Sequence, residues 1–86
     1  MKIAIIDDLL ECRNEIHVCL RRFFSEHYDD GSPCVTEFSS GEDFLSSFQK
    51  AAYDLIFIDQ YMQGRSGIDT ARQIRQRDNF VTLVFI

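Results

Sequence analysis

Four short apolar runs, separated by three amphipathic stretches, limit the possible folds of this chain more than any other feature. The runs cover residues 3–6, 34–38, 53–58 and 82–86. Runs of this length, rich in β-branched and aromatic side chains, are typical of buried strands. The stretches between them carry apolar residues at helical spacing. The sequence therefore predicts an α/β fold in which strands and helices alternate, with parallel strand pairing and right-handed crossovers.

The amphipathic stretches predict three helices. The first covers residues 10–25. Its expected buried face consists of Leu9, Cys12, Ile16, Phe23 and either Cys19 or Leu20. The second helix should start where Ser39 and Glu42 have the spacing of a capping box. The third should begin near Gly67 and stop at Asp78.

Aspartates stand at the ends of two apolar runs. Asp7 and Asp8 follow the first run, and Asp59 ends the third. Because α/β folds place ligands at the carboxyl edge of the sheet, we expect these three acids to share one site. Like charges at short range raise one another's pKa, so the arrangement calls for a cation or a proton. The alternative is that each aspartate only begins a polar turn after a strand.

Composition limits the partners and the compartment. The chain has 9 basic and 14 acidic residues and a net charge of -5, so direct nucleic-acid binding is not expected. Cys12, Cys19 and Cys34 lack the C-x-x-C spacing and are interpreted as small buried hydrophobes in a reducing cytoplasm. The first apolar run is too short for a signal peptide or a membrane anchor. We therefore expect one cytoplasmic domain without membrane attachment.

In this order, the motifs resemble the receiver domain of two-component response regulators. They are Ile-Ile-Asp-Asp at 5–8, Tyr-Asp-Leu-Ile-Phe-Ile-Asp at 53–59, Met62 and Gly67. Residues 67–72 and 84–86 are most similar to receivers of LytTR-type transcriptional regulators. The resemblance covers residues 1–86, about two-thirds of a complete receiver.

This resemblance implies a three-layer, flavodoxin-like α/β fold. The strand order is 2-1-3-4-5 in the full domain. Residues 1–86 would then be an incomplete receiver, truncated after the fourth strand, without the final helix, strand and helix.

The resemblance also implies a role for each acid. Asp59 would accept a phosphoryl group from a sensor histidine kinase as an aspartyl phosphate. Asp8 and Asp59 would bind Mg²⁺ directly, Asp7 would help through water, and the backbone carbonyl of Tyr61 would be a further ligand. The chain would then be no conventional enzyme, but a phosphoacceptor that takes part in its own phosphotransfer and dephosphorylation. Its target would be a LytTR-type DNA-binding effector outside this segment.

Two departures from the family pattern keep other functions open. Gln63 follows Met62 where receivers usually have proline, so the loop is expected to be less rigid. The Ser or Thr and the Lys that relay phosphorylation in receivers would lie beyond Ile86, so we expect weak or absent switching. A phosphorylation-independent interaction domain is the first alternative.

The exposed edge strand also predicts a homodimer, formed by edge pairing or by exchange of elements.

A magnesium-dependent phosphoryl-transfer enzyme is the second alternative. The sequence has no G-x-x-x-x-G-K-[ST] motif, which argues against a P-loop nucleotidase. Asp7 and Asp8 are adjacent, whereas aspartyl-nucleophile phosphatases have an Asp-x-Asp motif after the first strand.

Overall fold

The computed structural model describes residues 1–27 and 33–86, and it confirms the alternation of strands and helices. The elements are β1 (Lys2–Ile6), α1 (Leu10–His27), β2 (Cys34–Phe38), α2 (Gly41–Ser47), β3 (Leu55–Ile58), α3 (Gly67–Arg77) and β4 (Thr82–Phe85). All seven predicted elements are present at the expected places. Among the described residues, no helix is both long enough and apolar enough to cross a membrane.

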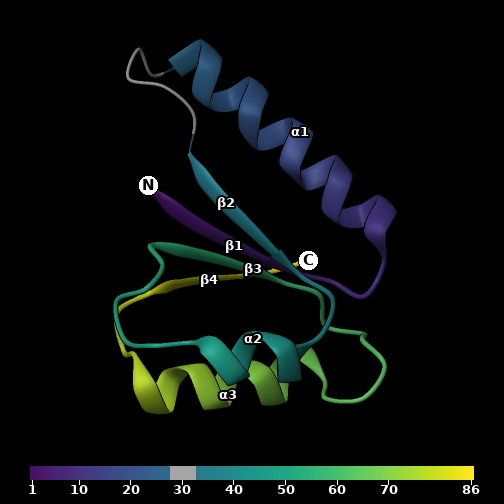
Figure 1. Cartoon of the computed structure of the whole chain (residues 1–86), viewed down its shortest axis with the longest axis vertical. Coiled ribbons are helices and arrows are strands. Elements are labelled where there is room, and N and C mark those ends of the chain that lie inside the picture. The colour runs from purple at the N-terminus through teal and green to yellow at the C-terminus, as the bar shows by residue number, and fades with distance from the viewer. Residues whose placement is uncertain (28–32) are drawn as a thin grey trace.

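The four strands form one parallel sheet with the order β2-β1-β3-β4. This is the order that the resemblance implied for the first four strands. Helix α1 lies on one side of the sheet, whereas α2 and α3 lie side by side on the other (Figure 1). In the central pairs, Ile6 is in register with both Phe38 and Ile58. The carboxyl ends of β1, β2 and β3 are therefore level with one another.

The main hydrophobic core lies between the sheet and the layer of α2 and α3. Alternate residues of β1 and β3 point into it, and these are Ala4, Ile6, Ile56 and Ile58. Phe44 of α2 is fully buried among them and packs edge-on against Phe38 at 5.1 Å between ring centroids. The other face of β1 is also covered, since Ile3 and Ile5 are fully buried. Burial on both faces explains why β1 is a continuous apolar run.

Helix α1 is rotated relative to the prediction. Leu9, just before it, is 58% exposed and Phe23 is 46% exposed, so the expected buried face was partly wrong. The half-buried side chains are instead Cys12, Arg13, Ile16, His17, Leu20 and Phe24. Cys19 and Cys34 are exposed, which corrects the expectation that they are buried. The physical reason is that Arg13 and His17 turn toward β2 to reach Glu37.

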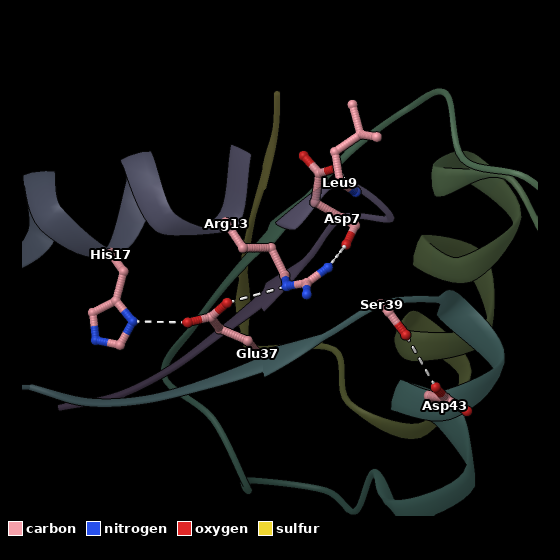
Figure 2. Close-up of polar contacts among 7 residues, drawn as sticks. All are labelled: Asp7, Leu9, Arg13, His17, Glu37, Ser39 and Asp43. Carbon is pink, nitrogen blue, oxygen red and sulfur yellow. Dashed lines mark hydrogen bonds and ion pairs between the residues drawn. The ribbon is translucent and has the colours of Figure 1, made fainter. Parts of the chain in front are cut away.

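Serine side chains cap the two later helices. The predicted capping box is wrong by one residue, because the N-cap of α2 is Ser40, which accepts a hydrogen bond from the Asp43 N–H at 3.0 Å. Ser39 instead donates from its hydroxyl to the Asp43 carboxylate at 3.3 Å (Figure 2). At α3, Ser66 accepts from the Asp69 N–H at 3.1 Å, so that helix starts where it was predicted to.

Candidate functional site

The three predicted acids meet at the carboxyl edge of the sheet. The sheet ladder continues one residue past β1 and β3, because the Asp7 N–H donates to the Phe38 carbonyl at 3.1 Å and the Asp59 N–H to the Ile6 carbonyl at 2.9 Å. Asp7, Asp8 and Asp59 each offer one carboxylate oxygen, and these oxygens lie within 4.8 Å of one another. The expectation that parallel strands bring these side chains together is therefore met.

Asp7 is the most buried of the three acids, with 3% of its surface exposed. Burial raises the pKa of Asp7, because desolvation disfavours its charged form. A hydrogen bond from the Leu9 N–H at 2.9 Å opposes this rise, and the charges of Asp59 and Asp8 add to it. The surroundings of Asp7 therefore disfavour its charged form.

The loop between β3 and α3 donates backbone hydrogen bonds to two of the acids. The Tyr61 N–H donates to Asp59 Oδ1 at 3.1 Å, and the Gln63 N–H to Asp8 Oδ2 at 3.3 Å. The Tyr61 side chain is 86% exposed, whereas Met62 points into the core. These contacts hold the loop over the acid cluster. The role of the Tyr61 carbonyl as a metal ligand stays a prediction.

Two glycines shape this loop for different reasons. Gly64 has a φ of 80°, a conformation that other residues rarely adopt. Gly67 is required for space instead. A Cβ atom there would lie 2.8 Å from Gln60 Cα and closer still to the Asp59 carbonyl oxygen. The third helix can therefore start directly behind the backbone of Asp59.

A polar bridge beside the acids was not predicted from the sequence. Arg13 donates from Nη1 to the Asp7 carbonyl oxygen at 2.7 Å and from Nε to Glu37 Oε1 at 3.1 Å. His17 Nδ1 lies 2.9 Å from Glu37 Oε2 (Figure 2). One signal was available, because a partly buried carboxylate in a strand needs a polar partner. The partner itself depends on the rotation of α1.

The acid cluster has the chemistry of a site for a hard divalent cation. Its donors are carboxylate oxygens, which Mg²⁺ and Ca²⁺ prefer. Within residues 1–27 and 33–86, no ion pair involves any of the three acids. Arg13 directs its N–H groups at a backbone carbonyl and at Glu37 instead. The residues present therefore fit a bound divalent cation.

Comparison with known proteins identifies the family. The model of the response regulator receiver domain matches residues 3–86. The chain belongs to the receiver domain family. Among its relatives, the transcriptional regulatory protein ResD of Bacillus subtilis is 33% identical over 76 residues, which are 88% of this chain and 28% of ResD. The sensory transduction protein LytR of Staphylococcus haemolyticus is 31% identical over 85 residues, which are 99% of this chain and 31% of LytR.

Solved receiver structures share the fold of this receiver domain. It superposes on the BeF3-activated receiver domain of DrrB, a Thermotoga maritima protein, with a TM-score of 0.71 and 23% identity. The superposition covers 98% of this chain and 62% of the DrrB chain. The receiver domain spans less than a third of the length of the curated relatives that it matches.

Proposed function

We propose that this receiver domain is the phosphoacceptor module of a two-component system, with Asp59 as the phosphorylated residue. The convergence of Asp7, Asp8 and Asp59 carries the proposal, because their oxygens lie within 4.8 Å of one another at the edge of the sheet. Asp59 directly follows β3, so the sheet fixes the position of its backbone. The residue is only half-buried, so its carboxylate remains accessible. The proposed donor is a sensor histidine kinase.

The proposed chemistry is transfer of a phosphoryl group to a carboxylate. An Asp59 oxygen attacks the phosphorus of the donor, forming an O–P bond as the bond from phosphorus to the donor histidine nitrogen breaks. The leaving imidazole keeps the electron pair and takes up a proton. When bound, Mg²⁺ supplies positive charge that offsets repulsion between the acids and the phosphoryl oxygens. Asp8, Asp59 and the Tyr61 carbonyl would hold the ion, and Asp7 would act through water.

The proposed output is control of transcription through another domain. One relative is named as a transcriptional regulatory protein and another as a sensory transduction protein. Together with the sequence resemblance, these names favour a LytTR-type DNA-binding effector. The same site would also take part in loss of the phosphoryl group. The free cysteines at positions 12, 19 and 34 fit a reducing, cytoplasmic compartment.

Intact-mass analysis of the full chain tests this function. The wild-type chain is incubated with a small phosphodonor, such as acetyl phosphate, and Mg²⁺. We expect it to gain the mass of one phosphoryl group, and we expect this gain to disappear in Asp59→Asn and on chelation of the metal. The matched control is Asp54→Asn, because Asp54 is exposed and lies just before the amino end of the same strand. Equal phosphorylation of wild type and Asp59→Asn would contradict the assignment.

One observation favours a second candidate, a receiver-like interaction domain that is not phosphorylated. The Gln63 N–H donates to Asp8, a hydrogen bond that proline at this position could not make. Backbone N–H groups of the loop therefore stabilise part of the negative charge of the acids. In this case the mass would not change with donor and Mg²⁺, and Asp59→Asn would leave partner binding intact.

A further inference from the structure

Helix α1 is attached to the sheet by half-buried side chains and by polar contacts. None of residues 10–26, which form all but the last residue of α1, is buried. Leu10 and Val18 are exposed, as is Leu9 before the helix. In Figure 1, α1 lies on the opposite side of the sheet from α2 and α3. The hydrogen bonds of Arg13 and His17 therefore act together with the half-buried apolar side chains of α1 in fixing this helix.

Glu37 of β2 is the centre of these contacts. Arg13 Nε donates to one oxygen of its carboxylate at 3.1 Å, and His17 Nδ1 lies 2.9 Å from the other (Figure 2). The hydrogen bond with His17, and then that with Arg13, lowers the pKa of Glu37, while its partial burial opposes this effect. Since both oxygens are occupied, the carboxylate and the Arg13 guanidinium hold each other in one orientation.

The same guanidinium fixes the peptide group that joins two of the acids. Arg13 Nη1 donates at 2.7 Å to the Asp7 carbonyl, which shares a planar peptide unit with the Asp8 nitrogen. The preceding peptide unit is fixed by the hydrogen bond from the Asp7 N–H to the Phe38 carbonyl at 3.1 Å. Both peptide units that flank the Asp7 Cα are therefore anchored, which limits the directions that the carboxylates of Asp7 and Asp8 can take.

Glu37 also determines what the positive charge of Arg13 does. A guanidinium free to turn toward the acid cluster would pair with the carboxylates and compete with a bound cation. Arg13 is instead directed at Glu37 and at a backbone oxygen, and its side chain is only 14% exposed. The pair therefore brings a rigid donor close to the acids while compensating its charge.

We propose that Arg13, held by Glu37, is a positioning residue for divalent-cation binding by Asp7 and Asp8. This inference rests on the cation site of the proposed function, but not on phosphorylation. A positioning role and a purely electrostatic role of Arg13 predict opposite effects of its removal on Mg²⁺ affinity. If Arg13 acted only through its charge, its removal would strengthen the binding of Mg²⁺. Because it orients the Asp7–Asp8 peptide, its removal weakens binding. Loss of a contact that orients a metal ligand typically weakens metal affinity by about 10-fold or more.

Magnesium titrations of the full chain, followed by the amide NMR signals of Asp7, Asp8 and Asp59, test this role. We expect Arg13→Gln to raise the Kd for Mg²⁺ by about 10-fold. Arg13→Lys should fall between Arg13→Gln and wild type, because an ammonium can reach one acceptor but cannot provide the two-pronged geometry. Arg21→Gln is the matched control, since Arg21 is an exposed arginine on the same helix. Its Kd should equal that of the wild type.

Glu37→Gln provides a second variant in case Arg13→Gln does not fold, which thermal melting would reveal. It keeps the shape of the strand residue but leaves the charge of Arg13 uncompensated, so its Kd should also rise. The positioning role would be overturned if a folded Arg13→Gln chain had an unchanged or lower Kd for Mg²⁺. If Arg13→Gln does not fold, the same result for Glu37→Gln would overturn it. In either case the cation site itself would remain in place. Absence of Mg²⁺ binding by the wild-type chain would instead overturn both the cation site and this role.

Discussion

At the scale of single residues, two buried aspartates have opposite environments. Asp7 lies beside Asp59 and Asp8, and its burial raises its pKa. Asp78, at the end of α3, accepts backbone hydrogen bonds from Phe80 at 2.8 Å and from Ala51 at 3.0 Å. These hydrogen bonds lower the pKa of Asp78. One carboxylate is therefore suited to a ligand, whereas the other fastens the chain at the opposite end of the sheet.

This contrast predicts opposite pH dependences of stability without metal. The pKa of Asp7 is raised in the folded state, so protonated Asp7 contributes to the stability of the fold at low pH. This contribution is lost as the pH rises through the pKa that Asp7 has in the folded state. Asp7→Asn should therefore raise the Tm by a few degrees at pH 7, and the gain should shrink toward pH 4. Asp78→Asn should lower the Tm at pH 7, and its loss should shrink as pH falls below about 4, the ordinary aspartate pKa.

Thermal unfolding between acidic and neutral pH, in the presence of a chelator, measures both effects. Glu15→Gln serves as an exposed control and should change the Tm little at any pH. Changes of the same sign for the Asp7 and Asp78 variants at pH 7 would contradict this account of the two sites.

The sequence predicted the acids of the site but not the residues that support them. Asp7, Asp8 and Asp59 could be located because each follows an apolar run, and parallel strands bring their ends to one edge. Arg13 and Glu37 could not be paired in the same way. Their contact depends on how β2 is aligned with β1 and on how α1 is rotated, and neither follows from local spacing.

At the scale of elements, α2 depends on its packing. It has seven residues, too few for a helix to be stable alone in water. Phe44 attaches it to the sheet, because the ring is fully buried and packs edge-on against Phe38 of β2 at 5.1 Å between centroids. The helix N-cap at Ser40 fixes only its first turn.

Truncation of this anchor should therefore be costly. We expect Phe44→Ala to lower the free energy of unfolding by about 3–5 kcal/mol, a large part of the stability of a small domain. Phe80→Ala is the matched control, since Phe80 is 86% exposed and its loss should have little effect. Urea denaturation followed by circular dichroism measures both. Similar losses in the two variants would show that the core does not depend on Phe44.

The periodicity of apolar residues was enough to predict every element. It was not enough to predict the buried face of α1, where Leu9 and Phe23 were expected inside and are exposed. Apolar periodicity reports packing, whereas the orientation of this helix follows polar contacts from Arg13 and His17 to Glu37. The cap of α2 was misplaced by one residue because Ser39 and Ser40 are adjacent and both interact with Asp43.

At the scale of the whole molecule, the strand order leaves β4 at an edge of the sheet. A groove of about 660 Å³ lies between β4 and α3. It is lined by Ile68, Ala71, Arg72, Arg75, Gln76, Leu83 and Phe85. Ile68 and Phe85 are both exposed large hydrophobic residues. An unpaired edge strand beside an apolar groove favours pairing with a second copy of the chain.

We therefore expect the chain to form a homodimer at tens of micromolar. Phe85→Lys should shift it toward monomer, because a charge on an edge strand opposes strand pairing. Val18→Lys, which places the same charge on an exposed apolar position of α1, is the control and should leave the dimer unchanged. Size-exclusion chromatography with light scattering gives the masses. A monomeric wild-type chain at this concentration would contradict the prediction.

The absence of buried side chains over residues 10–26 has a consequence for the dynamics of the domain. Such a helix can detach from the sheet at a lower free energy than the strands can separate, and its amide hydrogens should exchange with solvent first. Thermodynamic linkage makes the effect of Arg13 on cation affinity reciprocal. If attachment of the helix through Arg13 strengthens cation binding tenfold, then a bound cation must make detachment tenfold rarer. Cation binding at the acid site would thus slow amide hydrogen exchange along the whole length of α1.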